Sequence, residues 1–166
     1  MLSLRRCVVG VVAVLLMSGA ALAQMGARAG DPGFPSRTPA ELAELRVDAN
    51  AGSARAQFFL GIAYDTGMGV PHDDVEAVSW YRQAAERGNA AAQFNLGALY
   101  YSGQGVPQDY VEAHKWRNLA ASRASAETRQ QYGDARDEVA ERMTSQQLAD
   151  AQKLAREWLA AFEQRN

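Results

Sequence analysis

Residues 54–89, ARAQFFLGIAYDTGMGVPHDDVEAVSWYRQAAERGN, decide the fold because the chain repeats them at once. The following residues 90–125 read AAAQFNLGALYYSGQGVPQDYVEAHKWRNLAASRAS. Aligned without a gap, the two copies are identical at 19 of 36 positions. A fixed period of roughly 20–50 residues is typical of stacked repeat proteins. The sequence therefore predicts two consecutive copies of one structural unit.

Each copy is predicted to form a helix, a glycine turn and a second helix. Shared apolar and small residues in the first part follow steps of three and four, which is helical spacing with one buried side. The shared turns at 67–71 and 103–107 begin with a glycine that can close a helix, and they end in a proline. Asp73 and Asp109, each with Glu three residues later, predict an acidic capping box that opens the second helix. Small residues such as Gly61 would let a neighbouring helix come close.

The shared positions spell A-x-A-Q-x-x-L-G-x-x-Y-x-x-G-x-G-V-x-x-D-x-x-x-A-x-x-W-x-x-x-A-A in both copies. This pattern resembles the Sel-one-like repeat (SLR), a relative of the tetratricopeptide repeat, and covers residues 54 to about 125. The resemblance implies an all-α fold, a short α/α superhelical solenoid of tetratricopeptide-like helical hairpins. It also implies a role as a protein-binding scaffold.

Residues 1–23 are predicted to be a signal peptide. Arg5 and Arg6 precede an apolar run over 7–17, and the segment ends in an A-x-A cleavage motif at 21–23. The apolar run is shorter than the ~20 residues that a membrane-spanning helix needs. We therefore expect cleavage before Gln24 and no stable membrane anchor afterwards.

Loss of this leader would change the chemistry of the chain. The only cysteine, Cys7, and two of the basic residues would leave with it, so the net charge would change from −2 to −4. The cleaved protein would hold together without disulfides in an oxidising compartment. We expect an exported bacterial protein of the periplasm or the medium. The absence of a basic face argues against a nucleic-acid partner.

The two copies are predicted to lie between capping segments. Residues 24–37 are rich in glycine and proline and predict a flexible linker. Residues 38–53 predict a capping half-repeat, whose helix begins with Thr38 as N-cap and Glu41 three residues later. Residues 126–166 predict a longer C-terminal capping hairpin with helices over 127–143 and from Thr144 to about 164. Their expected buried faces hold Tyr132, Ala135, Val139 and Met143, then Leu148, Ala151, Ala155, Trp158 and Phe162. The alternative for the last helix is binding to a membrane or a partner, but its mixed charges favour core packing.

A binding groove is predicted on the first helix of each copy. Residues that differ between the copies recur in the first copy at spacings of four, three and four, so they form one stripe on one helix face. Packing fixes the shared face, and in helix-pair solenoids the first helices line the concave side. The candidate concave-groove residues are Arg55, Phe59, Ile62, Asn95 and Tyr101. The alternative is that a loop or the terminal hairpin covers these side chains.

The sequence offers little support for a catalytic site. The two histidines, His72 and His114, are not part of an H-x-x-x-H or carboxylate cluster, and no Ser-x-x-Lys motif occurs. We expect no catalytic residue, no metal and no cofactor. The sequence favours a non-catalytic scaffold that binds a protein segment in its concave groove. The alternatives are a secreted hydrolase of the β-lactam-binding type, because some secreted, cysteine-rich members of the resembling family have that link, and a self-associating structural module.

Overall fold

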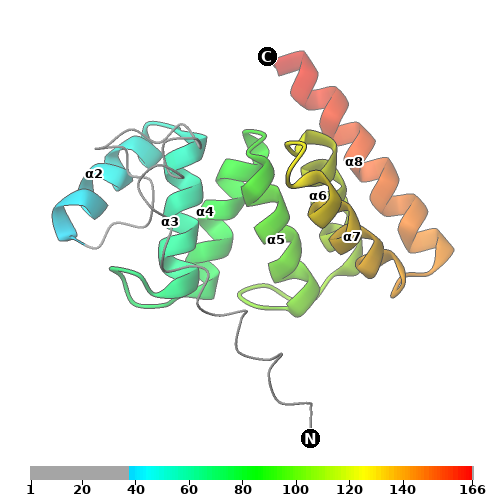
Figure 1. Ribbon diagram of the computed structural model, residues 1–166, viewed down its shortest axis with the longest axis horizontal. Coiled ribbons are helices and arrows are strands. Elements are labelled where there is room, and N and C mark those ends of the chain that lie inside the picture. Colours follow the sequence, from blue (N-terminus) through cyan, green and yellow to red (C-terminus); the bar gives the residue numbers. More distant parts are fainter. Residues whose placement is uncertain (1–37, 166) are drawn as a thin grey trace, which may run out of the picture. The chain divides into compact units, whose positions relative to one another are not determined.

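The computed structural model describes residues 38–165, which form seven α-helices and no strand (Figure 1). The predicted signal peptide and linker lie outside the described residues. The all-α prediction is confirmed. The helices are α2 (Pro39–Asn50), α3 (Ala54–Thr66), α4 (Asp74–Glu86), α5 (Ala90–Ser102), α6 (Tyr110–Arg123), α7 (Arg129–Ala140) and α8 (Ser145–Arg165).

The two sequence copies form equivalent hairpins, α3–α4 and α5–α6. Gly67 and Gly103 end the first helices in the left-handed region, with φ of +72° and +76°. The Asp73 carboxylate caps α4, because its Oδ1 accepts from the backbone N–H groups of Val75 and Glu76 at 3.0 Å each. The reciprocal half of the predicted capping box is wrong. The Asp73 N–H donates instead to the carbonyl oxygen of Tyr64 at 3.0 Å, so the turn uses the donor that Glu76 would have bonded.

The helices of the first hairpin meet at a glycine. A Cβ atom at Gly61 would lie 2.4 to 2.9 Å from three ring carbons of Tyr81, a contact shorter than real side chains allow. Tyr81 is fully buried. The expectation that a small residue lets the neighbouring helix come close is therefore confirmed at Gly61.

A glutamine joins each first helix to the helix before it. Gln57 Nε2 donates to the carbonyl oxygen of Ala49 at 2.9 Å, and Gln93 Nε2 donates to that of Ala85 at 3.1 Å. Both glutamines are at least 99% buried. Because losing the acceptor of a buried N–H group is costly, each bond fixes the position of one first helix against the last turn of the preceding helix.

The junction between α2 and α3 has the same contacts as the junction between α4 and α5. The predicted box at the start of α2 is present: Glu41 N–H donates to Thr38 Oγ1 at 3.3 Å, and Thr38 N–H donates to Glu41 Oε2 at 3.2 Å. Arg46 donates to the Tyr64 hydroxyl across this junction. At the next junction, 36 residues later, Arg82 donates to Tyr100. In both pairs the guanidinium lies 5.9 Å from the tyrosine ring centre.

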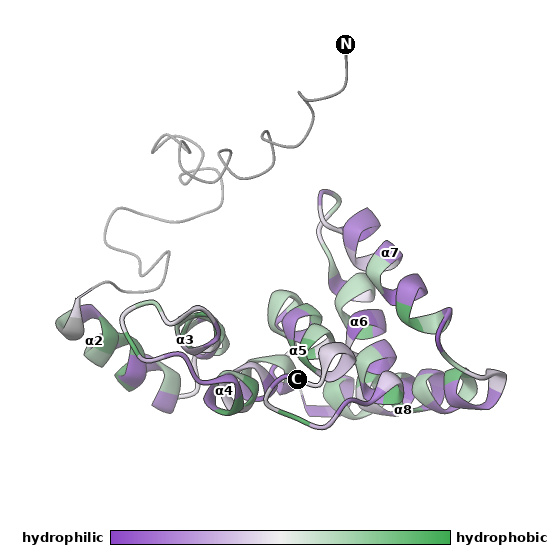
Figure 2. Ribbon diagram, turned by 90° about the horizontal axis from the view of Figure 1, so that it is seen from below, coloured by the Kyte–Doolittle hydropathy of each residue, from purple (hydrophilic) through white to green (hydrophobic). Residues whose placement is uncertain are grey.

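The last two helices close the stack, as predicted. Helix α7 is shorter than expected because residues 126–128 and 141–143 form turns at its ends. Thr144 and Gln147 form the predicted capping box, with N–H to oxygen distances of 2.9 and 3.2 Å. Helix α8 packs on α6, and Figure 2 shows α3, α5 and α7 on one side of the stack with α4 and α8 on the other. None of the described helices is long and apolar enough to cross a membrane.

Candidate functional site

Three of the five predicted groove residues form one stripe on α3. The Arg55 guanidinium lies 5.6 Å from the centre of the Phe59 ring. Arg55 is exposed, whereas Phe59 and Ile62 are half-buried. Phe59 contacts Phe58 with ring centres 5.5 Å apart and packs on the apolar cluster that α2 and α3 share. This face of α3 therefore carries an aromatic ring and a guanidinium group side by side.

Asn95 lies by a buried tyrosine on the same side of the stack. The Tyr81 hydroxyl donates to Asp65 Oδ2 at 3.0 Å. Burial raises the pKa of Tyr81, and the charge of Asp65 raises it further, while a hydrogen bond with Asn95 opposes the shift. The raised pKa accords with a protonated Tyr81 hydroxyl that donates to Asp65. The three side chains form a polar cluster, Asp65–Tyr81–Asn95, that joins α3, α4 and α5.

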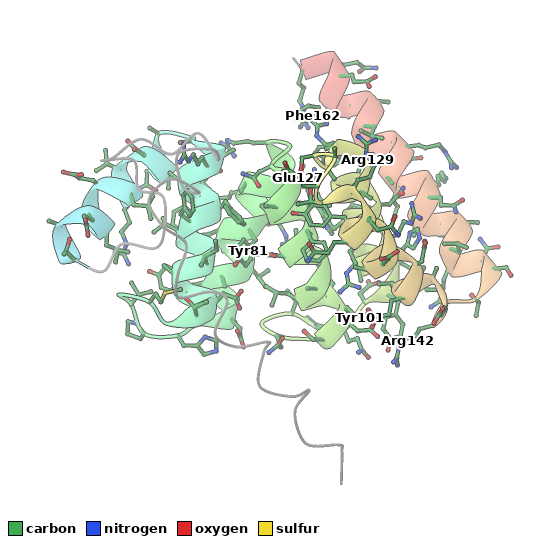
Figure 3. All side chains as sticks on the ribbon, in the orientation of Figure 1. Tyr81, Tyr101, Glu127, Arg129, Arg142 and Phe162 are labelled. Carbon is green, nitrogen blue, oxygen red and sulfur yellow. The ribbon has the colours of Figure 1, made fainter. Side chains whose placement is uncertain are left out.

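Tyr101 belongs to a different cluster, at the junction with α7. Its hydroxyl donates to Glu138 Oε1 at 2.8 Å, and this hydrogen bond raises the pKa of Tyr101. The guanidinium groups of Arg117 and Arg142 lie 4.9 and 5.5 Å from its ring centre. Figure 3 shows Tyr101 beside Arg142 and away from Tyr81. The predicted groove residues are thus divided between the α3 stripe, the Tyr81 cluster and this junction.

Sequence reasoning missed Asp65, Tyr81 and Arg117, although a signal for them was present. Asp65 and Tyr81 correspond to Tyr101 and Arg117 after a shift of 36 residues, so both partners change together between the copies. The first copy joins its helices by a hydrogen bond, and the second joins them by a guanidinium stacked over a ring. The sequence signal is that two positions, 65 and 81, both differ from their counterparts 101 and 117 in the second copy. Two positions that change together in this way indicate that their side chains are in contact.

A cavity of about 410 Å³ lies among the last three helices, α6, α7 and α8. His114 lines it and is only 3% exposed. Among the described residues, its Nδ1 is one of the buried polar atoms without a hydrogen-bond partner. Burial lowers the pKa of His114, and the positive charge of Arg136 lowers it further. The cavity lining is His114, Asn118, Arg136, Asp137, Ala140, Leu148, Gln152 and Arg156.

We predict that His114 makes the protein less stable in mild acid. Because the folded pKa lies below the ordinary value of about 6.5, the unfolded chain takes up this proton first as the pH falls. The melting temperature should therefore drop as the pH decreases from 7.5 to 5.5. His114→Val, which installs the residue found at the equivalent position 78, should reduce the drop. An equal drop in the His114→Val protein would contradict the prediction.

A second cavity, of about 530 Å³, lies between α2 and α4. It holds one histidine, His72, whose Nδ1 lies 3.1 Å from the Tyr64 carbonyl oxygen and whose Nε2 lies 3.3 Å from Asp74 Oδ1. Within residues 38–165, no group of three or more His, Cys, Asp or Glu side chains could hold a metal. The lining residues are Arg46, Asn50, Tyr64, Pro71, His72, Asp73, Glu76 and Trp80.

Stacked helical hairpins with a fixed period define the class of protein, an α/α solenoid of the tetratricopeptide type. The Sel1 repeat family matches residues 54–89 and 90–125, the two copies found in the sequence. Residues 54–125 are therefore two consecutive Sel1 repeats.

Two solved structures are similar to the chain. One is c5321, a protective antigen present in uropathogenic Escherichia coli strains that displays an SLR fold, with 33% identity and a TM-score of 0.70. The match covers 88% of this chain and 31% of that one. The other is a Sel1 repeat protein from Oxalobacter formigenes, with 37% identity, a TM-score of 0.52, and 57% and 39% of the two chains covered. The chain thus spans about a third of the length of these relatives. Comparison with curated proteins found no match.

Proposed function

We propose that the chain is an exported, non-catalytic scaffold that binds a segment of another protein on the face formed by α3 and α5. Sel1 repeat proteins generally mediate protein–protein interaction, which supports the class of function. The α3 stripe of Arg55, Phe59 and Ile62 supports the location.

The main support for this binding face is that two large apolar residues of the first copy are replaced at the equivalent positions of the second. The second copy has Asn95 where the first has Phe59, and Ala98 where it has Ile62, yet both form helices of 13 residues with a side-chain N-cap and a glycine C-cap. Repeat packing therefore does not require the large apolar side chains at 59 and 62. A half-buried phenylalanine beside an arginine is typical of binding hot spots, where aromatic and arginine side chains are enriched. The expected partner segment offers an apolar side chain to Phe59 and a carboxylate to Arg55.

We predict that replacing both Phe59 and Asn95 by serine abolishes capture of the partner while the fold is retained. The test is crosslinking in the bacterial envelope followed by purification of the tagged chain. The matched control is Val75→Ser, which removes an apolar side chain that is 65% exposed on α4. Capture should persist with this control. If the double variant captures the same protein as the wild type, the binding face lies elsewhere.

A thermal melt separates binding from packing in this experiment. Phe59 packs on the cluster shared by α2 and α3, so part of any loss could come from unfolding. The double variant should melt cooperatively, within a few degrees of the wild type. A much lower melting temperature with unchanged capture would assign Phe59 to the core.

Export and the absence of catalysis are tested on the same protein. We infer removal of residues 1–23 from the charged, apolar and small-residue segments of the leader. N-terminal sequencing of protein recovered from the periplasm or the medium should begin at Gln24. Recovery of the chain from the cytoplasm with Met1 intact would contradict export. Turnover of a chromogenic β-lactam by the purified protein would contradict the scaffold assignment.

A further inference from the structure

We propose that the 530 Å³ cavity between α2 and α4 is a second docking site, which takes a partner-protein helix carrying a tryptophan and another aromatic residue four positions later. The site uses other residues than the α3 stripe, although Phe59 and Trp80 pack on the same apolar cluster. The argument rests on what the chain's own α8 does at the equivalent place in the second repeat.

In the second repeat, α8 supplies such an aromatic pair. Trp158 Nε1 donates to Glu86 Oε2 at 2.9 Å, and its ring meets Trp116 edge to face with centres 6.1 Å apart. Phe162 stacks on Trp158 at 4.9 Å. The Arg123 guanidinium lies 4.3 Å from the centre of the Phe162 ring. A carboxylate, a tryptophan and an arginine together thus hold two aromatic rings from one helix face; Figure 3 labels Phe162 near the end of α8.

The equivalent positions, 36 residues earlier, lie on α2, on α4 and just after α4. Glu86 corresponds to Asn50, Trp116 to Trp80 and Arg123 to Arg87. Asn50 and Trp80 both line the 530 Å³ cavity.

The arginine positions agree as well. The Arg87 guanidinium lies 3.6 Å from where a Cβ of Gly52 would be, and the Arg123 guanidinium lies 2.8 Å from the same point on Gly88. A Cβ on Gly88 would also lie 2.8 Å from Phe162, whereas the atoms near Gly52 belong to Arg87 alone. The aromatic pair is thus the part of the second-repeat arrangement that the first repeat lacks within the described residues.

The first tryptophan also differs in its hydrogen bonding. Trp116 Nε1 donates to Glu112 Oε2 at 2.9 Å. In the part of the chain that the structure describes, Trp80 Nε1 is buried without a partner. Glu112 corresponds to Glu76, so the acceptor in the second repeat belongs to the repeat itself, and a partner helix would add ring contacts to Trp80 instead of this hydrogen bond.

The proposed occupant is a segment of a partner protein. The chain has three tryptophans, and Trp158 is the one outside the repeats. Its indole N–H is already bonded to Glu86, at the end of the first repeat, and α8 cannot cover both sites at once. A partner helix with the pattern of 158–162, aromatic residues one turn apart on an amphipathic face, fits the chemistry of the surface.

The probe is a fluorescent peptide with the sequence of residues 145–165, added to the purified chain and followed by anisotropy. We expect saturable binding and at least about tenfold weaker binding of a peptide with the Trp158→Ala change. Asn50→Glu, which installs the acceptor that Glu86 provides, should tighten binding about threefold to tenfold. A gain of affinity cannot come from unfolding, so this variant keeps the test valid if other variants lose stability.

Matched arginine variants show which repeat the peptide uses. Arg87→Ala should weaken binding, and Arg123→Ala should not. The reverse result would mean that the peptide displaces the chain's own α8 from the second repeat, and it would overturn the proposal. Concentration-dependent dimers in light scattering that Asn50→Glu strengthens would assign the site to a second copy instead of a partner. The Phe59 and Asn95 double variant should bind the peptide normally, which separates this site from the proposed function.

Discussion

Replacing Gly61 by alanine is expected to lower the free energy of unfolding by about 2–3 kcal/mol, at the upper end of what overpacking usually costs. The added methyl group would lie 2.4 Å from a ring carbon of Tyr81. Tyr81 cannot move aside easily, because it is fully buried and its hydroxyl is bonded to Asp65. The separation of α3 from α4 must therefore increase, and the loss should appear in urea denaturation as a lower midpoint.

Gly133 supplies the matched control for this prediction. It is also a helical glycine, in α7, but a Cβ there would have no atom within 4 Å. Gly133→Ala should therefore stabilise the protein by about 0.5–1 kcal/mol, because alanine loses less backbone entropy in a helix. Opposite signs for the two variants are the expected result. If Gly61→Ala were also stabilising, the close approach of α3 and α4 would not exist in solution.

Truncation of Trp116 is expected to have the largest effect of any single substitution discussed, a loss of about 3–5 kcal/mol in the free energy of unfolding. Trp116 is 2% exposed and belongs to the main apolar cluster. It also supports α8 through the edge contact with Trp158. Trp116→Ala should therefore leave a cavity and weaken the docking of the C-terminal helix.

Trp80, at the same position of the first repeat, is the internal comparison. It is half-buried, its indole N–H has no partner among the described residues, and it lines an open cavity. Trp80→Ala should cost clearly less than Trp116→Ala, and hydrogen exchange should show loosening of α8 only in the Trp116 variant. Equal losses at both positions would show that α8 adds nothing to the second repeat.

Most of the fold was predictable because the signals that start and end its helices are local in sequence and occur in both copies. Glycines 67 and 103 mark the ends of two helices, and Asp73 and Asp109 mark the starts of the next two. Each signal depends on a few neighbouring residues, so spacing alone locates it. The capping box at Asp73 failed because its reciprocal bond competes with the Tyr64 carbonyl across the turn, which helix signals do not encode.

The candidate site was less predictable because its contacts join distant residues. Comparison of the copies found the α3 stripe, since unshared positions on one helix face can be read directly. It did not find that Tyr101 points toward Glu138, which is 37 residues away and outside the copies. The hydrogen bond from Trp158 to Glu86 joins residues 72 positions apart, and the sequence around neither residue predicts it.

The glutamine bonds between repeats have an evolutionary consequence. Gln57 donates to the Ala49 carbonyl and Gln93 donates to the Ala85 carbonyl. Each repeat therefore contains the glutamine that bonds the preceding helix and the carbonyl that accepts from the next repeat. A tandem duplication of 36 residues, inserted after Asn89, would therefore contain both the glutamine donor and the carbonyl acceptor that these hydrogen bonds need. Such arrays can therefore gain or lose repeats in evolution without a new type of contact between neighbouring repeats.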